Sequence, residues 1–345
     1  MKKPILLMLC LCLLSACSGK AEKDIKTDPN AGLLELYEAC ADVRGETEAY
    51  LEKLEGMGWC AVDAKHRYDM VNWQQVDGFL KGEGGDEVRF LVLHGDGGFE
   101  AVTLSRTDIA SVRVADVNGQ AAVTWEKSYE LERFKYTEKG WLFLMRVMPD
   151  NPQGGNHDGW EEPTLVYRIK PMDAQLREAC EKYIEPLGYG TDGFFLSNWS
   201  DGNWTGLNFA GLFPCAYSVY YGKDLFYYDS PYPQAGTETR ALVPAAEYEA
   251  IMLPLLDMTA EQLRAAAGFD GENYTVWTVS TLNPRFSDVF PEVTELLDNG
   301  DGTVTLTVDG VSQSLFGDSV FTHRVKVRDA EKGFAYLANT VEKKS

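Results

Sequence analysis

The side chains best suited to contact a ligand lie in residues 193–204, where Trp199 and Trp204 flank a short polar turn. Asp201 and Asn203 stand between the two tryptophans. Exposed indoles can stack on sugar rings, while carboxylates and amides beside them hydrogen-bond to sugar hydroxyls. The alternative is a hairpin whose two indoles pack inward as ordinary core. The segment therefore predicts either a glycan contact at these four residues or a buried aromatic pair.

The sequence carries no other pattern typical of catalysis or metal binding. It has no His-Glu-x-x-His pair, no Gly-x-Ser-x-Gly elbow and no glycine-rich phosphate loop. Its four histidines are His66, His94, His157 and His323. His323 alternates with apolar residues, as a core histidine does on a strand, and His157 beside Asp158 is a weak metal candidate. We therefore predict no catalytic residues, no metal and no cofactor.

The first sixteen residues have the features of an export signal. Lys2 and Lys3 precede the uncharged apolar residues 5–14, which as a helix span about 15 Å, half of a hydrocarbon core of about 30 Å. Such a segment is typical of a signal peptide rather than a membrane-spanning helix. The following Leu14-Ser15-Ala16-Cys17 resembles the lipobox of bacterial lipoproteins. The resemblance implies cleavage before Cys17 and diacylation of its thiol, and two acyl chains hold a protein stably on a membrane.

Behind the lipidated Cys17, the polar residues 17–30 predict a short tether. No later stretch is apolar for long enough to span a bilayer. The expected location is therefore the extracytoplasmic face of the cell membrane, with membrane lipid as a partner through Cys17.

The mature chain is strongly acidic. Removing residues 1–16 takes two of the 32 basic residues and leaves 30 against 53 acidic ones, a net charge of −23. Such a surface repels nucleic acid and anionic headgroups, so we expect no nucleic-acid partner. Cations, basic peptides, neutral sugars or an envelope protein fit this charge better, although the acidity also serves plain solubility.

Four cysteines remain in the exported chain besides Cys17: Cys40, Cys60, Cys180 and Cys215. An exported protein with four cysteines allows three disulfide connectivities. The local choice is Cys40–Cys60 and Cys180–Cys215. The alternative is that all four are buried thiols, because cysteine is among the most buried residue types without any bridge.

Hydrophobic periodicity predicts helices followed by antiparallel strands in the first half. Residues 33–57 and 72–81 have helical spacing, with a short strand at 59–62 between them. Alternating apolar residues then predict strands at 88–94, 99–104, 109–116, 121–124, 129–136 and 141–148. Pro, Gly and Asp crowd residues 149–163, which favours a linker.

The second half begins with another predicted helix at 173–187. Aromatic-rich strands are predicted at 194–199, 205–209, 217–221 and 225–228, and a helix at 244–256. Thr259 and Gln262 match a capping box that opens a helix to residue 267. The last predicted strands cover 274–279, 293–297, 303–309, 320–327 and 334–340.

These elements predict an α+β fold of two tandem modules, each with one or two helices packed on an antiparallel sheet. The expected boundaries are 1–16 for the signal peptide, 17–30 for the tether, 31–149 for the first module, 150–170 for the linker and 171–345 for the second module.

Several short segments also resemble an uncharacterised lipoprotein family of Gram-positive gut anaerobes. They are Pro171-Met172-Asp173, Leu187-Gly188-Tyr189, Val243-Pro244, Asp301-Gly302-Thr303-Val304-Thr305-Leu306-Thr307-Val308 and Tyr336-Leu337-Ala338-Asn339. The resemblance runs along most of the mature chain. It implies an anchored surface protein and brings no activity with it.

The two halves share short signatures that suggest a diverged duplication. Glu38-Ala39-Cys40 matches Glu178-Ala179-Cys180 in the opening helices, and Glu138-Lys139-Gly140-Trp141 corresponds to Glu331-Lys332-Gly333-Phe334 before a late strand. Tripeptide matches also arise by chance. We predict that superposition of residues 31–148 on 171–341 separates these two explanations.

The sequence alone assigns no activity. The leading expectation is a non-enzymatic lipoprotein that binds or scaffolds something at the cell envelope. The alternatives are a solute-binding lipoprotein of a transporter, which the lack of regular βαβ alternation weakens, and a glycan-active envelope enzyme. A deep pocket, converging carboxylates or a flat surface would distinguish these three.

Overall fold

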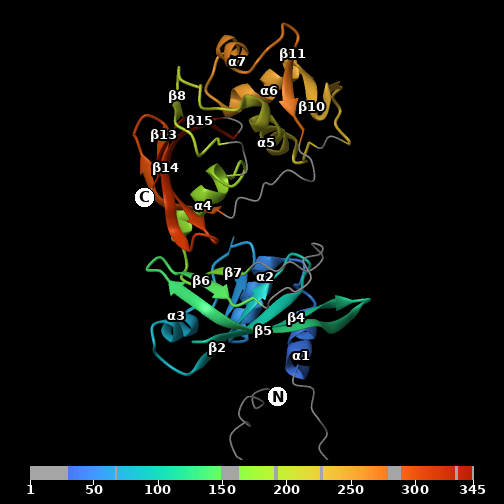
Figure 1. The fold of residues 1–345 in the computed structure, drawn as a ribbon, viewed down its shortest axis with the longest axis vertical. Helices are drawn as coiled ribbons and strands as arrows, with labels where there is room; N and C mark the ends of the chain where they lie inside the picture. Colours follow the sequence, from blue (N-terminus) through green and yellow to red (C-terminus); the bar gives the residue numbers. More distant parts are fainter. Residues whose placement is uncertain are drawn as a thin grey trace, which may run out of the picture.

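The computed structural model describes residues 30–66, 68–148, 163–189, 193–225, 228–278, 289–330 and 333–343. Over these ranges the chain forms seven helices and fifteen strands arranged in three sheets. The fold is therefore mixed α and β, with most of its core built on sheet (Figure 1). The predicted signal peptide, Cys17, the tether and His157 lie outside the described residues.

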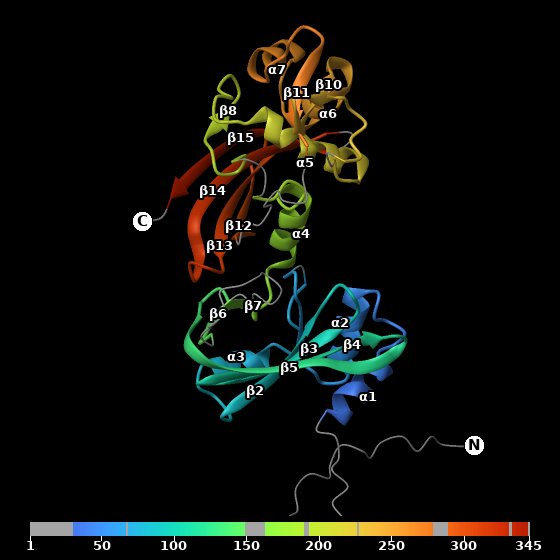
Figure 2. The same ribbon diagram turned by 45° about the vertical axis from the view of Figure 1, so that its right-hand side comes forward.

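A seven-stranded sheet occupies one end of the molecule, with three helices around it (Figures 1 and 2). Its strands follow the chain order from β1 to β7. β1 pairs parallel to β2, and every later neighbour is antiparallel, so the sheet is mixed rather than purely antiparallel as predicted. The elements are α1 (Ala31–Ala39), α2 (Thr47–Gly56), β1 (Ala61–Asp63), α3 (Gln74–Leu80), β2 (Glu87–Leu93), β3 (Phe99–Ser105), β4 (Asp108–Val117), β5 (Gln120–Tyr136), β6 (Trp141–Arg146) and β7 (Thr164–Arg168).

Both faces of this sheet are covered. Phe90 and Val92 of β2 join one apolar cluster, which contains α3, whereas Leu91 and Leu93 join another, which contains α1 and α2. Successive side chains of a strand point to opposite faces, so the two clusters lie on opposite sides of the sheet.

The rest of the chain forms a five-stranded sheet, in the order β12-β13-β14-β15-β8, and a three-stranded sheet, β11-β10-β9. In both ribbon views the three-stranded sheet lies at the end far from β1–β7 (Figures 1 and 2). The elements are α4 (Ala174–Tyr183), β8 (Trp199–Ser200), α5 (Phe209–Tyr221), β9 (Gln234–Ala235), β10 (Thr237–Pro244), α6 (Ala245–Leu255), α7 (Ala260–Ala266), β11 (Asn273–Trp277), β12 (Val289–Asp298), β13 (Thr303–Ser312), β14 (Gly317–Asp329) and β15 (Phe334–Lys343).

One apolar cluster fills the space between these two smaller sheets and helices α4 to α7. A further cluster joins Trp141, Phe143 and Val166 of the seven-stranded sheet to Val311 and Phe316 of the five-stranded one. Because this cluster draws on both parts of the chain, the structure does not establish two independent closed modules.

Several predicted elements have different bounds in the structure. The helix predicted over 33–57 is two helices, α1 and α2, with a turn between them. The strands predicted at 121–124 and 129–136 are one long strand, β5, with an irregularity in its pairing. Residues 164–168, predicted to belong to the linker, form β7, while 149–162 lie outside the described residues.

The strands predicted at 205–209 and 217–221 are wrong, because residues 205–208 form a turn and an irregular segment and residues 209–221 form helix α5. The aromatic content favoured strands, but the buried residues recur at helical spacing, as Phe209, Leu212, Phe213, Ala216 and Tyr217. The side chain of Asn208 accepts a hydrogen bond from Gly211 N and caps the helix start. The capping box of Thr259 and Gln262 is confirmed at the start of α7.

The predicted duplication is not decided by this arrangement. Strands β6 and β15 begin at the last residue of the two shared tetrapeptides, and each lies next to the edge strand of its sheet. However, α1 packs against β4 and β5, whereas α4 packs against β12. Glu331 and Lys332 of the second tetrapeptide lie outside the described residues. The duplication stays a prediction.

Candidate functional site

The predicted glycan contact at Trp199 and Trp204 is wrong, because both indoles are buried. Trp199 is 2% exposed and Trp204 is 7% exposed. Their rings stack at a centroid distance of 5.5 Å, and Trp199 Nε1 donates to Phe194 O over 2.8 Å. The pair is core, as the alternative interpretation held.

Asp201 and Asn203 do lie at an exposed turn, but without the indole platform they were expected to support. The amide oxygen of Asn203 accepts a hydrogen bond from Thr205 Oγ1 over 2.9 Å, which stabilises the turn itself. These two side chains therefore stay at the surface while the aromatic rings face the core.

The predicted disulfide between Cys40 and Cys60 is absent. Both residues are buried thiols, and they belong to the clusters on opposite faces of the seven-stranded sheet. The Cys60 thiol donates to Asn72 O over 3.3 Å, and burial raises its pKa to about 11. The sheet itself separates the two sulfurs, so this bridge does not form.

The predicted bridge between Cys180 and Cys215 is also absent, although both thiols belong to one core cluster. Cys180 Sγ donates to Pro291 O at 3.6 Å, which directs the thiol toward β12 rather than toward α5. Burial raises the pKa of Cys180 to about 12. A thiol held in its protonated form is a poor nucleophile.

The imidazole of His323 is part of the core, as predicted. It is fully buried between Tyr189, whose hydroxyl lies 3.0 Å from Nε2, and Asn339, whose Oδ1 lies 2.8 Å from Nδ1. Burial lowers its pKa to about 4. A neutral ring with both nitrogens partnered is a structural group.

A cavity of about 410 Å³ lies where the seven-stranded sheet meets α4 and β12, and we name it the junction pocket. This volume is within the range of small-molecule sites. Its walls come from four places: the turn after β1, the start of β6, α4 with the turn that follows it, and the start of β12, with α5 behind them. The lining residues are Lys65, His66, Trp141, Met172, Arg177, Cys180, Glu185, Pro186, Leu187, Gly188, Tyr189, Cys215, Ser218, Val289, Phe290 and Pro291.

His66 is the most unusual group in this pocket. Its backbone has φ of +58°, a left-handed conformation that is uncommon for a residue with a side chain. Its ring packs edge-on against Trp141 and Phe290, with centroids 5.5 and 5.1 Å away. Burial lowers the pKa of the imidazole to about 4. Within the described residues, its buried Nδ1 has no hydrogen-bond partner, which is unusual for a buried polar atom.

Two cations reach the rim of the junction pocket. Arg177 of α4 is held by Asp69, with Nη2 2.7 Å from Oδ2. The second carboxylate oxygen of Asp69 accepts from Met172 N over 3.0 Å, which ties the residues before α4 to the loop between β1 and α3. Lys65 is exposed, and its ammonium group makes no ion pair within the described residues.

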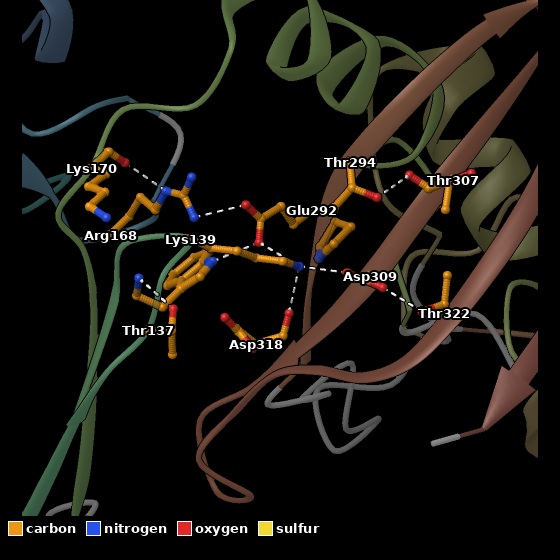
Figure 3. Close-up of polar contacts among 12 residues, drawn as sticks. Thr137, Lys139, Arg168, Lys170, Glu292, Thr294, Thr307, Asp309, Asp318 and Thr322 are labelled. Atoms are coloured by element: carbon orange, nitrogen blue, oxygen red, sulfur yellow. Dashed lines mark hydrogen bonds and ion pairs between the residues drawn. The ribbon is translucent and has the colours of Figure 1, made fainter. Parts of the chain in front are cut away.

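A buried charge network lies beside the pocket and joins the two larger sheets (Figure 3). Glu292 of β12 accepts hydrogen bonds from Trp141 Nε1 and from Arg168 Nη1, each over 2.8 Å. Lys139 places its ammonium 2.6 Å from Asp309 Oδ2 and 3.6 Å from Glu292 Oε2. The network fixes Trp141, which is also a wall of the pocket.

The pKa of Asp309 shows which charge state the network holds. Burial opposes ionisation of its carboxyl group, but the hydrogen bonds from Lys139 and Thr322 outweigh that cost and lower the pKa. Asp309 is therefore ionised and pairs with the Lys139 ammonium. Such a network can hold neighbouring groups in position.

Burial sets the protonation state of two side chains in the junction pocket. Its Cys180 thiol is protonated, its histidine is neutral, and Glu185 is the single carboxylate among its lining residues. Within the part of the chain that the structure describes, no group of three His, Cys, Asp or Glu side chains is placed to hold a metal ion. In the same part, no helix has the length and apolar composition needed to cross a bilayer.

Sequence reasoning missed this site because its residues are far apart in the chain. His66 and Trp141 carry no motif, and only the fold brings them to Phe290. A partial signal was present: Met172, Leu187, Gly188 and Tyr189 belong to two of the short segments that resemble an uncharacterised family, and all four line the pocket.

Comparison with known proteins gives a family without an assigned role. The family of unknown function DUF6070 matches residues 31–345, and the chain belongs to this family. The expected membership of an uncharacterised family is thereby confirmed, whereas the lipoprotein signal and the Gram-positive host stay predictions. No curated protein and no solved structure matches the chain.

Proposed function

We propose that this DUF6070 protein is a lipid-anchored extracytoplasmic binding protein that takes a small ligand in the junction pocket. The observation that carries the proposal is the pocket itself: aromatic walls from two sheets, a volume of about 410 Å³ and a buried His66 Nδ1 with no partner in the described ranges. Apolar walls with a few placed polar groups are typical of ligand sites.

The pocket supports binding over the two other roles considered. A glycan-active enzyme needs two carboxyl groups that face each other across the substrate, and the described lining offers only Glu185. A scaffold needs a flat surface rather than a hollow one. A solute-binding lipoprotein of a transporter is the second candidate, because the pocket lies between two parts of the chain that could close on a solute. Because the junction pocket lies between the seven-stranded sheet and the part that contains α4 and β12, its location also supports a division of the chain into two tandem modules.

The binding claim is tested with the neutral fluorescent probe N-phenylnaphthylamine and the full mature chain. Val289→Trp, at the first residue of β12, should fill the junction pocket and abolish the rise in fluorescence that the probe shows when it binds. The matched control is Val117→Trp on the β4–β5 hairpin, where the side chain is 43% exposed and remote from the pocket. Equal probe fluorescence in both variants would overturn the proposal.

The anchor rests on Leu14-Ser15-Ala16-Cys17, which places a cysteine directly after an apolar signal core. Cys17→Ala should abolish incorporation of an alkyne-tagged fatty acid and move the protein out of the detergent phase in a Triton partition. The Cys12→Ala variant, inside the signal core, should incorporate the label like the wild type. A Cys17→Ala protein that is still acylated would refute the anchor.

A further inference from the structure

A second hollow lies beside α4, near the junction pocket. It has a volume of about 600 Å³ and shares the lining residues Arg177 and Glu185 with the pocket, so the two hollows are neighbours. We name it the acidic groove. Its other lining residues are Glu48, Tyr68, Ala174, Glu178 and Glu181.

Four glutamates give this groove its character. Glu178, Glu181 and Glu185 follow one another at spacings of three and four residues, so they share one face of α4 and the turn after it. Glu48, in the first turn of α2, also lines the groove. The carboxylates of Glu48, Glu178 and Glu181 are exposed and make no ion pair in the described residues.

The arginine among the lining residues does not neutralise Glu178 or Glu181. Arg177 is already paired with Asp69 over 2.7 Å. Like charges on one helix face destabilise the helix, so the repulsion between Glu178 and Glu181 lowers the stability of α4 beside the pocket. A net charge of −21 on the whole chain adds a long-range attraction for cations.

The shape of the hollow decides between kinds of cation. The glutamates lie along the groove instead of converging, and no metal-sized cluster of His, Cys, Asp or Glu exists among the described residues. A bare ion or a polyamine would also leave the aromatic pocket empty. A ligand that fills both spaces needs an apolar group next to a flexible amine or guanidinium.

We propose that the pocket and the acidic groove together bind a basic peptide segment. An aromatic or large apolar side chain enters the junction pocket against His66, Trp141 and Phe290, and Lys or Arg side chains one or two residues away pair with Glu178 and Glu181. An extended chain advances about 3.3 Å per residue, which suits two adjoining subsites. This inference rests on the proposed function and names its ligand class.

The test uses fluorescein-labelled peptides and anisotropy with the full mature chain. Gly-Lys-Trp-Lys-Gly should bind, and Kd should rise steeply with salt because the pairs are exposed. Gly-Glu-Trp-Glu-Gly should not bind, and Gly-Lys-Gly-Lys-Gly should bind weakly because it lacks the apolar group. Spermidine should compete poorly with the first peptide.

Two variants of equal net charge locate the effect. The double variant Glu178→Gln, Glu181→Gln should raise Kd for the basic peptide about tenfold. The control Glu261→Gln, Glu272→Gln, on exposed positions at and after α7, should change it little. Equal changes in both variants, or equal affinity for the acidic peptide, would overturn the peptide assignment. If the groove variant still binds N-phenylnaphthylamine, the pocket proposal survives without the peptide assignment. If the wild type does not bind this probe, the pocket proposal and the peptide proposal are both rejected.

Discussion

His323 shows how strongly burial sets the chemistry of a single side chain in this protein. Its ring is fully buried, and both nitrogens have partners in Tyr189 and Asn339. The pKa falls from an ordinary 6.5 to about 4 because a charged ring would have to leave water. The folded state therefore binds fewer protons than the unfolded state between these two values.

This difference predicts a loss of stability on acidification. Above pH 6.5 the ring is neutral in both states, and as the pH falls toward 4 the unfolded state alone takes up the proton. His323 should thus cost about 2 kcal/mol of unfolding free energy at pH 5 relative to pH 7.5. His323→Gln should remove that part of the pH dependence, measured by urea unfolding at the two pH values. An unchanged pH dependence in the variant would contradict a neutral buried ring.

Among single residues, the sequence correctly predicted that His323 is buried but did not predict which way the two tryptophans face. The core role of His323 followed from its alternation with apolar neighbours. The direction of Trp199 and Trp204 did not follow from sequence, because an indole beside a polar turn can face water or the core with the same neighbours. The direction of the indole depends on its hydrogen-bond partner, which for Trp199 Nε1 is Phe194 O. A backbone oxygen five residues away forms no recognisable sequence motif.

Among the elements, the turn between β5 and β6 is closed tightly at Gly140. Its φ is +98°, and a Cβ there would lie 2.4 Å from the Cβ of Lys170 and 2.8 Å from Lys170 N. The carbonyl of Gly140 accepts from Ile169 N over 2.8 Å, so the turn is bound to the chain that follows β7. Only glycine fits this approach.

Gly140→Ala should therefore cost more than a simple change of backbone preference. We expect a loss of roughly 3 kcal/mol from strain and overpacking together. Gly119→Ala is the matched control: φ is +83°, but nothing lies within 4 Å of the added Cβ, so only about 1 kcal/mol is expected. Thermal or urea unfolding of both variants measures the difference, and similar losses would mean that the Lys170 contact yields freely.

The elements that sequence predicted well are those with a local cause. The capping box at Thr259 and the alternation in β2, β3 and β13 to β15 depend on neighbours in the chain, and all were found. Helix α5 was missed because its aromatic content outweighed its helical spacing. Strand β7 was missed because its residues gain their place only by pairing with β6, a contact that no local pattern reveals.

Over the whole molecule, charge is distributed in two different ways. The surface is acidic, with 53 acidic residues against 32 basic ones, whereas the boundary between the larger sheets concentrates cations. Lys139 and Arg168 reach from the seven-stranded sheet to Asp309 and Glu292 of the five-stranded one (Figure 3). Sequence could not predict these pairs, because a chain with so many acids gives no basis for choosing two.

The pair of Glu292 with Arg168 joins the two sheets, and each residue is only 5% exposed. Glu292→Gln keeps the shape of the side chain but leaves the Arg168 guanidinium buried without a countercharge. A loss of roughly 3 kcal/mol in unfolding free energy is expected. Asp301→Asn, which removes the exposed pair with Lys326, should cost less than about 1 kcal/mol.

The same variant links this network to binding. Glu292 also accepts from Trp141 Nε1, so its loss frees an indole that forms one wall of the junction pocket. N-phenylnaphthylamine should bind more weakly to Glu292→Gln under conditions where the variant remains folded, and normally to Asp301→Asn. Equal stability of the two variants would show that the network contributes no more than a surface pair, and unchanged probe affinity would show that Trp141 is fixed by packing against His66 and Phe290 alone.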